Sequence, residues 1–332
     1  MRRLPRPLKI MAQGTWEHVH PDVIRVPGGF AGFEFWMAFT PYPKGNFRME
    51  NPCIRASRDG LDWTVPTGCP DPLLPAPDSP ASHHADPDLH WEDGVLHMVF
   101  MTTALVNRWT TFQEITTRDG ITWSEPKVLF EGVWGVSPAL AKWDGKWCMW
   151  SVHMDTSKGF GNGVVQVRTR DRDGTFGSTR TCAMSIPGYL PWHLDVVAME
   201  DRVLALVAAA RKGGDSSRTW LFLLESRDGR TFSLLKPGPI LGPSLTGWDN
   251  RMIYRSSLCP LGDGNWRLYY SASSWGKRFG LGLLEGPLDR LEVPSPLPCL
   301  QPLSLGLKAR EDLLGLAKRI ARKRLPWLRR FR

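Results

Sequence analysis

The chain of 332 residues contains no run of 18 apolar residues, so no transmembrane helix is predicted. Its basic first residues are not followed by the apolar core of a secretory signal. The six cysteines are scattered without a CxxC pair, which indicates neither a zinc cluster nor a disulfide framework. These absences predict free cysteines, a cytoplasmic location and no cofactor.

The excess of basic residues lies at the two ends of the chain. The formal net charge is +9, but residues 300–332 contribute ten Lys/Arg against two acidic residues, and residues 1–10 contribute four more. The body from 11 to 299 therefore carries a net charge of −3. Such a body offers no basic surface that could follow a phosphate backbone, so nucleic acid is not an expected partner.

Tryptophan, glycine and proline are abundant, with 16, 32 and 28 copies. Short apolar runs separated by Gly and Pro turns predict an all-β chain. One turn pattern recurs: Ser57-Arg58-Asp59-Gly60, Thr117-Arg118-Asp119-Gly120, Asp173-Gly174 and Ser226-Arg227-Asp228-Gly229. Successive aspartates lie 60, 54 and 55 residues apart, and Gly282–Asp289 is a degenerate fifth copy. We expect the Asp of each turn to cap it, which is a structural role.

Each repeat also has a strand, a tight turn and a second strand upstream of its Asp-Gly turn. A unit therefore holds two hairpins, or four antiparallel strands, in about 56 residues. Repeated radially, five such units form a five-bladed β-propeller of four-stranded blades over residues 15–297. Residues 1–14 are then a basic N-terminal extension and residues 298–332 a basic tail. Two packed β-sandwiches are the alternative, but they do not explain the period.

The innermost strand of each propeller blade lines a central channel, so the polar residues at its start converge. The predicted inner strands begin at His20-Pro21-Asp22, Asp86-Pro87-Asp88, Ser137, His193-Leu194-Asp195 and Tyr254-Arg255-Ser256-Ser257. The alternation of a strand places His20 with Asp22, and His193 with Asp195, on one side.

Several carboxylates at one channel mouth could differ in pKa and so provide the acid and the base of glycosidic cleavage. Asp22 is the predicted base or nucleophile, Asp195 or Glu50 the acid, and Asp88 a supporting charge. Arg255 would hold a carboxylate ionised or bind an anionic sugar. The alternative is structural: the aspartates accept hydrogen bonds from backbone amides of neighbouring blades and close the ring.

The remaining candidates are expected to contact substrate. They are His20, His84, Asp86, His193, Trp134 and Trp192. The tryptophans could stack on sugar rings, although packing between blades is the simpler role. Imidazole and carboxylate groups suit zinc or manganese, but no tight ligand spacing is present, and no metal site is predicted.

The turns Ser57–Trp63 and Thr117–Trp123 resemble the shortened Asp-box turns of five-bladed propeller glycosidases, which include glycoside hydrolase family 43 and the invertase-like enzymes. His20–Val23, Phe35–Tyr42 and Glu50-Asn51-Pro52 are similar to sialidase-like propellers of bacteria and phages. The family 43 resemblance implies a general-base Asp in blade one, matched by Asp22. Ser137 and Asp195 stand where it implies an Asp in blade three and a Glu in blade four.

Residues 303–325 have the pattern of an amphipathic helix, with Leu313, Leu316 and Ile320 on one face and basic residues around the rest. Either an anionic membrane surface, here the inner membrane, or a protein partner fits residues 303–332. For the whole chain two functions stay open. One is a glycosidase acting on a poly- or oligosaccharide, and the other is a non-catalytic glycan- or protein-binding propeller in a surface or phage assembly.

Overall fold

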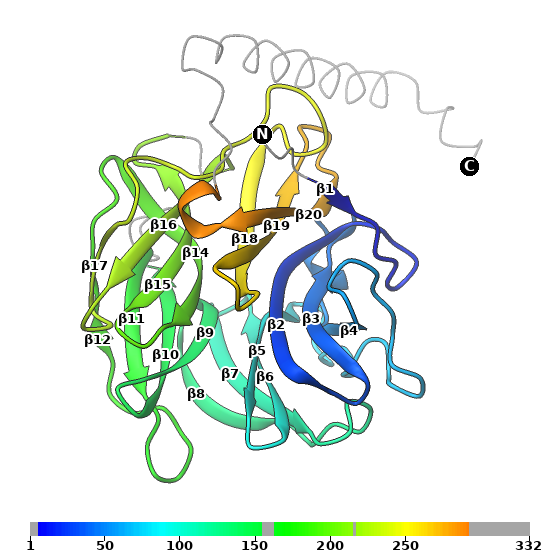
Figure 1. Cartoon of the computed structure of the whole chain (residues 1–332). Coiled ribbons are helices and arrows are strands. Elements are labelled where there is room, and N and C mark those ends of the chain that lie inside the picture. The colour runs from blue at the N-terminus through cyan, green and yellow to red at the C-terminus, as the bar shows by residue number, and fades with distance from the viewer. Residues whose placement is uncertain (1–5, 155–162, 215–216, 292–332) are drawn as a thin grey trace, which may run out of the picture.

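Five mainly antiparallel sheets surround a central axis in the computed structural model, which describes residues 6–154, 163–214 and 217–291 (Figure 1). The inner strand of each sheet contacts the inner strand of the next, in the order β2, β5, β9, β14, β18 and back to β2. The predicted all-β five-bladed propeller is therefore confirmed.

The blades follow one another along the chain. Blade one contains β2 (His18–Phe30), β3 (Phe33–Pro41) and β4 (Cys53–Ser57), with the 3-10 helices η1 (Pro43–Gly45) and η2 (Phe47–Met49) between β3 and β4. Blade two contains β5 (Ser82–Glu92), β6 (Val95–Ala104), β7 (Trp109–Thr117) and β8 (Lys127–Val133). Blade three contains β9 (Gly135–Trp143), β10 (Lys146–Met154), β11 (Gly163–Thr169) and β12 (Arg180–Thr181). Blade four contains β13 (Ala183–Met184), β14 (Tyr189–Ala198), β15 (Val203–Arg211), β16 (Thr219–Ser226) and β17 (Thr231–Leu234). Blade five contains β18 (Met252–Pro260), β19 (Asn265–Ser273), β20 (Phe279–Pro287) and β1 (Arg6–Leu8), and η4 (Leu288–Arg290) follows β20.

Two blades differ from the expected four strands. Blade one has three, and its outer position is reduced to a single bridge between Ala56 and Thr64. Pro66, Pro70 and Pro72 follow that bridge, and proline cannot donate the backbone hydrogen bond that would extend it. Blade four has five strands because β13 pairs in parallel with β17.

The segment expected as an N-terminal extension contributes to the ring. Strand β1 pairs with β20, so the outer strand of the last blade comes from the start of the chain. Ile10 and Ala12 then pack in a buried cluster with Val23 and Phe39 of blade one. This arrangement joins the first and last blades through both hydrogen bonds and apolar packing.

The helix predicted within residues 303–325 lies outside the described residues. Within the described ranges, no helix is long and apolar enough to span a membrane.

The Asp-Gly turns are structural, as the sequence predicted. Asp59 Oδ1 accepts hydrogen bonds from the N–H groups of Leu61 and Asp62 at 2.8 and 3.0 Å. Asp119 and Asp228 do the same in blades two and four. These local bonds fix each turn between the third strand of a blade and its outer edge.

Candidate functional site

A β-bulge near the start of each inner strand shapes the channel wall. The pairing register shifts there in all five blades. In blades one to three the bulge residue is His20, Asp86 or Ser137, with φ of 56°, 51° and 53°. Left-handed φ at a non-glycine residue costs about 1–3 kcal/mol and is concentrated at functional sites. A bulge also redirects side chains, here toward the channel axis.

His20, Asp86 and His193 meet in the channel although they come from blades one, two and four, and we call these three residues the channel group. Their ligand atoms all lie within 4.8 Å of one another. His20 Nε2 is 3.0 Å from Asp86 Oδ1, and His193 Nδ1 is 3.6 Å from Asp86 Oδ2. All three side chains are buried.

Two further residues hold this group in place. Glu50 Oε2, at the end of the β3–β4 connection, lies 3.3 Å from His20 Nδ1. Ser137 donates its backbone N–H to Asp86 Oδ2 at 2.7 Å, and its Oγ shares a 2.6 Å hydrogen bond with His193 Nδ1. Glu50 also lines an outer hollow of about 500 Å³ between η2 and residues 70–76, so it connects the buried group with the surface.

The three members of the channel group differ in charge. Burial disfavours a charged imidazole, but the negative charges of Asp86 and Glu50 outweigh it and raise the pKa of His20 to about 9. Burial lowers the pKa of His193 to about 3. For Asp86, the charges of His20 and His193 outweigh burial and hold the pKa of its carboxyl well below the ordinary range. At neutral pH the group therefore contains an imidazolium, a carboxylate and a neutral imidazole.

The donor set of the channel group fits a divalent metal ion. Two imidazoles and a carboxylate are a common ligand set for zinc and related ions. Within the described chain His193 Nε2 is buried without a hydrogen-bond partner. The raised pKa of His20 reflects negative charge from Asp86 and Glu50 that a cation would also neutralise. No metal-ligand spacing was visible in the sequence because each residue comes from a different blade.

The aspartates predicted to be catalytic lie two residues further along their strands and connect neighbouring blades. Asp22 Oδ2 accepts the N–H of Leu89 in blade two at 2.6 Å, and Asp88 Oδ2 accepts the N–H of Leu140 in blade three at 2.9 Å. Asp195 Oδ2 accepts the N–H of Leu258 in blade five at 3.0 Å. The structural alternative expected such bonds from all three residues, which we call the clasp aspartates.

Blades five and three have no aspartate at the clasp position and differ from this pattern. Ser257 Oγ accepts the N–H of Val23 at 3.0 Å and donates to Asp22 Oδ1 at 2.9 Å, which joins blade five to blade one. Blade three has Ala139 at the equivalent position, and its methyl side chain cannot accept a hydrogen bond from blade four. The N–H of Val196 donates instead to its own neighbour, Asp195 Oδ1, at 2.8 Å.

Arg255 lies among the clasp aspartates and is fully buried. Its Nη2 donates to Asp88 Oδ1 at 3.0 Å and to the carbonyl of Pro138 at 2.9 Å. Burial nevertheless raises the pKa of Asp22 and, with the charge of Asp22, raises that of Asp88 well above its ordinary value. The same causes raise the pKa of Asp195 to about 8. One guanidinium thus cannot keep three adjacent carboxyls ionised.

The other predicted contact residues are divided between the channel and its surroundings. The Trp192 ring lies 5.7 Å from the His193 ring, beside the channel group. His84 shares a 2.8 Å hydrogen bond with Thr102 and lies outside that group. Trp134 packs on the core of blade three, with the Arg108 guanidinium 5.0 Å from its ring.

Sequence reasoning gave no role to Ser137 or Tyr254. The Tyr254 ring lies 4.3 Å from the His193 ring, and burial raises the pKa of its hydroxyl well above 10. The signal that could have identified Ser137 is the proline that follows the bulge residue in blades one to three: Pro21, Pro87 and Pro138. Aligning those prolines places Ser137 level with His20 and Asp86.

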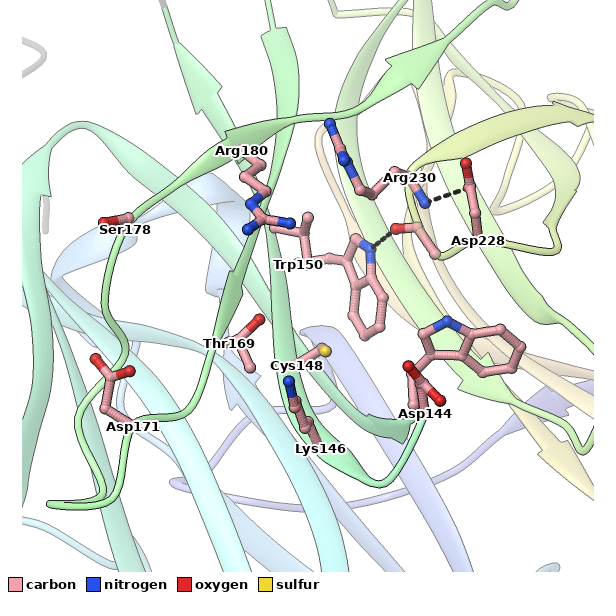
Figure 2. Close-up of a pocket in the computed structure, with 13 residues that line it drawn as sticks. Asp144, Lys146, Cys148, Trp150, Thr169, Asp171, Ser178, Arg180, Asp228 and Arg230 are labelled. Atoms are coloured by element: carbon pink, nitrogen blue, oxygen red, sulfur yellow. Dashed lines mark hydrogen bonds between the residues drawn. The ribbon is translucent and has the colours of Figure 1, made fainter.

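A separate hollow of about 370 Å³ lies between blades three and four (Figure 2). Two residues of its wall make structural hydrogen bonds. Trp150 Nε1 donates to the Gly229 carbonyl at 2.9 Å, and Asp228 Oδ1 accepts the N–H of Arg230 at 2.8 Å. It contains none of the predicted site residues, and we assign it no part in the channel chemistry.

Comparison with known proteins gives one sequence relative and several structural ones. No protein-family model matches the chain. It is 26% identical over 315 residues to the A type blood N-acetyl-alpha-D-galactosamine deacetylase of Flavonifractor plautii, with 76% of this chain and 40% of that protein covered. The chain thus spans less than half the length of this curated relative.

Two solved structures share the fold. The N-acetylgalactosamine deacetylase from F. plautii, in complex with blood group B trisaccharide, superposes with a TM-score of 0.78 at 19% identity, covering 87% of this chain and 96% of that one. A GH43_1 enzyme from Xanthomonas citri gives 0.60 at 11% identity, covering 90% and 95%. The chain is therefore a five-bladed β-propeller related in fold to both, which confirms the resemblance to family 43 at the level of fold.

Proposed function

We propose that this chain is a carbohydrate-active hydrolase that removes the acetyl group from an N-acetylated sugar at the channel group. The observation that carries the proposal is the meeting of His20, Asp86 and His193 from three blades, each at a β-bulge, with left-handed φ at His20 and Asp86. The 26% identity to a protein named as a sugar deacetylase supports the same reaction class. The hydrogen bonds of the clasp aspartates favour this reaction over glycosidic cleavage, because those carboxylates already hold backbone amides.

Hydrolysis of the amide joins the oxygen of water to the acetyl carbon and breaks the bond from that carbon to nitrogen. A divalent ion held by the channel group would polarise the carbonyl and make the water more acidic. Glu50 is a carboxylate beside this group, so it is placed to accept the proton of the water and return it to the leaving nitrogen. The hydroxyl of Tyr254 stays protonated, so it is a hydrogen-bond donor beside the same group.

Ser137 has a positioning role in this scheme. The hydrogen bond of Ser137 to the His193 ring fixes the orientation of the imidazole, and the Ser137 N–H holds Asp86. Groups that orient metal-binding side chains in this way affect metal affinity about 10–100-fold when they are removed.

A glycosidase remains the second candidate because the clasp aspartates form a group of carboxyls within 4.8 Å with raised pKa values. A carboxylic acid with a raised pKa is suited to protonate a leaving glycosidic oxygen. A hollow of about 380 Å³ at the opposite channel mouth reaches all three carboxyls.

One experiment separates the two reactions. A panel of oligosaccharides containing N-acetylhexosamine is incubated with the protein, and released acetate and new reducing ends are measured in the same samples. We expect acetate without new reducing ends, and we expect His193→Ala and Glu50→Gln to abolish the release of acetate. The control His84→Gln, outside the channel group, should retain it. New reducing ends lost in Asp22→Asn would instead establish the glycosidase, and binding without either product would leave a glycan-binding propeller.

A further inference from the structure

A second group of potential metal ligands lies away from the channel group, at the contact between blades two and three. His90 on β5 pairs directly across the sheet with His97 on β6, and Glu114 lies on the next strand, β7. One ligand atom from each of these three residues lies within 4.8 Å of the other two. We call these residues the seam group.

The geometry of the seam group follows from cross-strand pairing. The rings of His90 and His97 stack with centroids 4.4 Å apart and planes at 17°. Glu114 Oε1 lies 3.2 Å from His97 Nδ1 and 3.9 Å from His90 Nε2. A carboxylate oxygen therefore lies within reach of both imidazoles.

His90 is the feature that packing alone does not explain. Its side chain is 5% exposed, and in the described part of the chain neither ring nitrogen has a hydrogen-bond partner. A buried polar group without a partner costs about 1–3 kcal/mol, and each such group requires an explanation.

The residues around the seam group leave Glu114 Oε1 facing the two histidines and leave a path by which an ion can reach His90. Arg170 of blade three binds Glu114 Oε2 at 2.6 Å, so it orients the carboxylate and leaves Oε1 toward the histidines. His90 and Trp147 also line the hollow of about 380 Å³ at the opposite channel mouth. An ion entering this hollow would therefore reach His90.

We propose that the seam group binds a divalent transition-metal ion of the zinc class through His90, His97 and Glu114. Two imidazoles and one carboxylate match the preference of zinc for nitrogen and oxygen ligands and leave a fourth position for water. The site is separate from the channel group and does not depend on the proposed deacetylation. It would link the three consecutive strands of blade two beside the surface that contacts blade three.

The test uses the His193→Ala protein, in which the channel group has lost a ligand and the seam group is intact. The protein is stripped with a chelator, loaded with Zn²⁺ and freed of excess metal, and zinc per chain is measured by atomic emission. We expect one bound zinc ion per chain. Adding His90→Phe, which keeps an aromatic ring between His97 and Trp147, should remove that zinc. Adding His84→Gln, on the same strand but outside the group, should not.

The same comparison is made in the otherwise wild-type chain, where His90→Phe and His97→Gln should each remove one equivalent of metal. Bound Co²⁺ should give a visible absorption band that these two variants lack. Circular dichroism and thermal unfolding verify that each variant is folded. The proposal is overturned if folded His193→Ala binds no zinc, or if folded His90→Phe and His97→Gln bind as much as their parents.

Discussion

Asp22 of blade one accepts the backbone N–H of Leu89 in blade two at 2.6 Å. This bond crosses from one inner strand to the next and is repeated from Asp88 to Leu140 and from Asp195 to Leu258. A polar residue at a fixed place in the repeat therefore serves mainly to join blades around the channel.

Replacing Asp22 by alanine should destabilise the fold by about 1–3 kcal/mol, because the buried N–H of Leu89 loses its acceptor. Urea unfolding followed by tryptophan fluorescence measures the change. The matched control is Asp62→Ala, on the exposed side of a turn, which should change stability by less than about 0.5 kcal/mol. Unchanged stability of Asp22→Ala would show that the clasp contributes nothing to the ring.

Arg255→Met should destabilise the fold more than Asp22→Ala does. Removing one partner of a buried ion pair typically costs about 3–5 kcal/mol. Adding Asp88→Asn removes the other partner and should recover part of the loss. The two single variants and the double variant form a thermodynamic cycle, and simple additivity of the two losses would contradict the pairing of Arg255 with Asp88.

Gly120→Ala should destabilise the second Asp-Gly turn by about 1–3 kcal/mol. Gly120 has φ of 74°, and an added Cβ would lie 2.5 Å from Cη2 of the buried Trp36 in blade one. Gly94 is the matched control, with φ of 77° and no atom within 4 Å of an added Cβ. Gly94→Ala should therefore cost only the backbone strain, and equal thermal shifts in the two variants would refute the contact.

The stability of the metal-free chain should fall as pH rises from about 6.5 to 9. The pKa of His20 is raised to about 9 in the folded state, so its protonated form contributes stability that is complete below 6.5 and lost as pH rises through 9. The contribution is at most about 3 kcal/mol. Urea unfolding across this range, in the presence of a chelator, measures it.

His20→Gln should flatten this decline, because the variant cannot bind the proton. Asp195, with its pKa raised to about 8, contributes in the same direction and should leave a residual slope. An unchanged slope in His20→Gln would show that His20 is not protonated in the folded chain.

Local chemistry made the architecture readable from the sequence. An Asp-Gly turn is fixed by bonds within four residues, as between Asp59 and the amides of Leu61 and Asp62. Four copies of that turn and a degenerate fifth, with paired apolar runs, suffice to predict five blades. The reduced outer edge of blade one and the use of β1 in blade five were not predictable, because both depend on strands far apart in the chain.

The sequence by itself determined the fold and which polar residues begin the inner strands. Only the tertiary structure decided their partners, because bulges and the closure of the ring set which side chains meet. Asp22 and His20 are two residues apart, yet one joins two blades and the other belongs to the channel group. His193 reaches Asp86 only because blades two and four face the same channel. Their chemistry is a property of the closed ring and not of any single repeat.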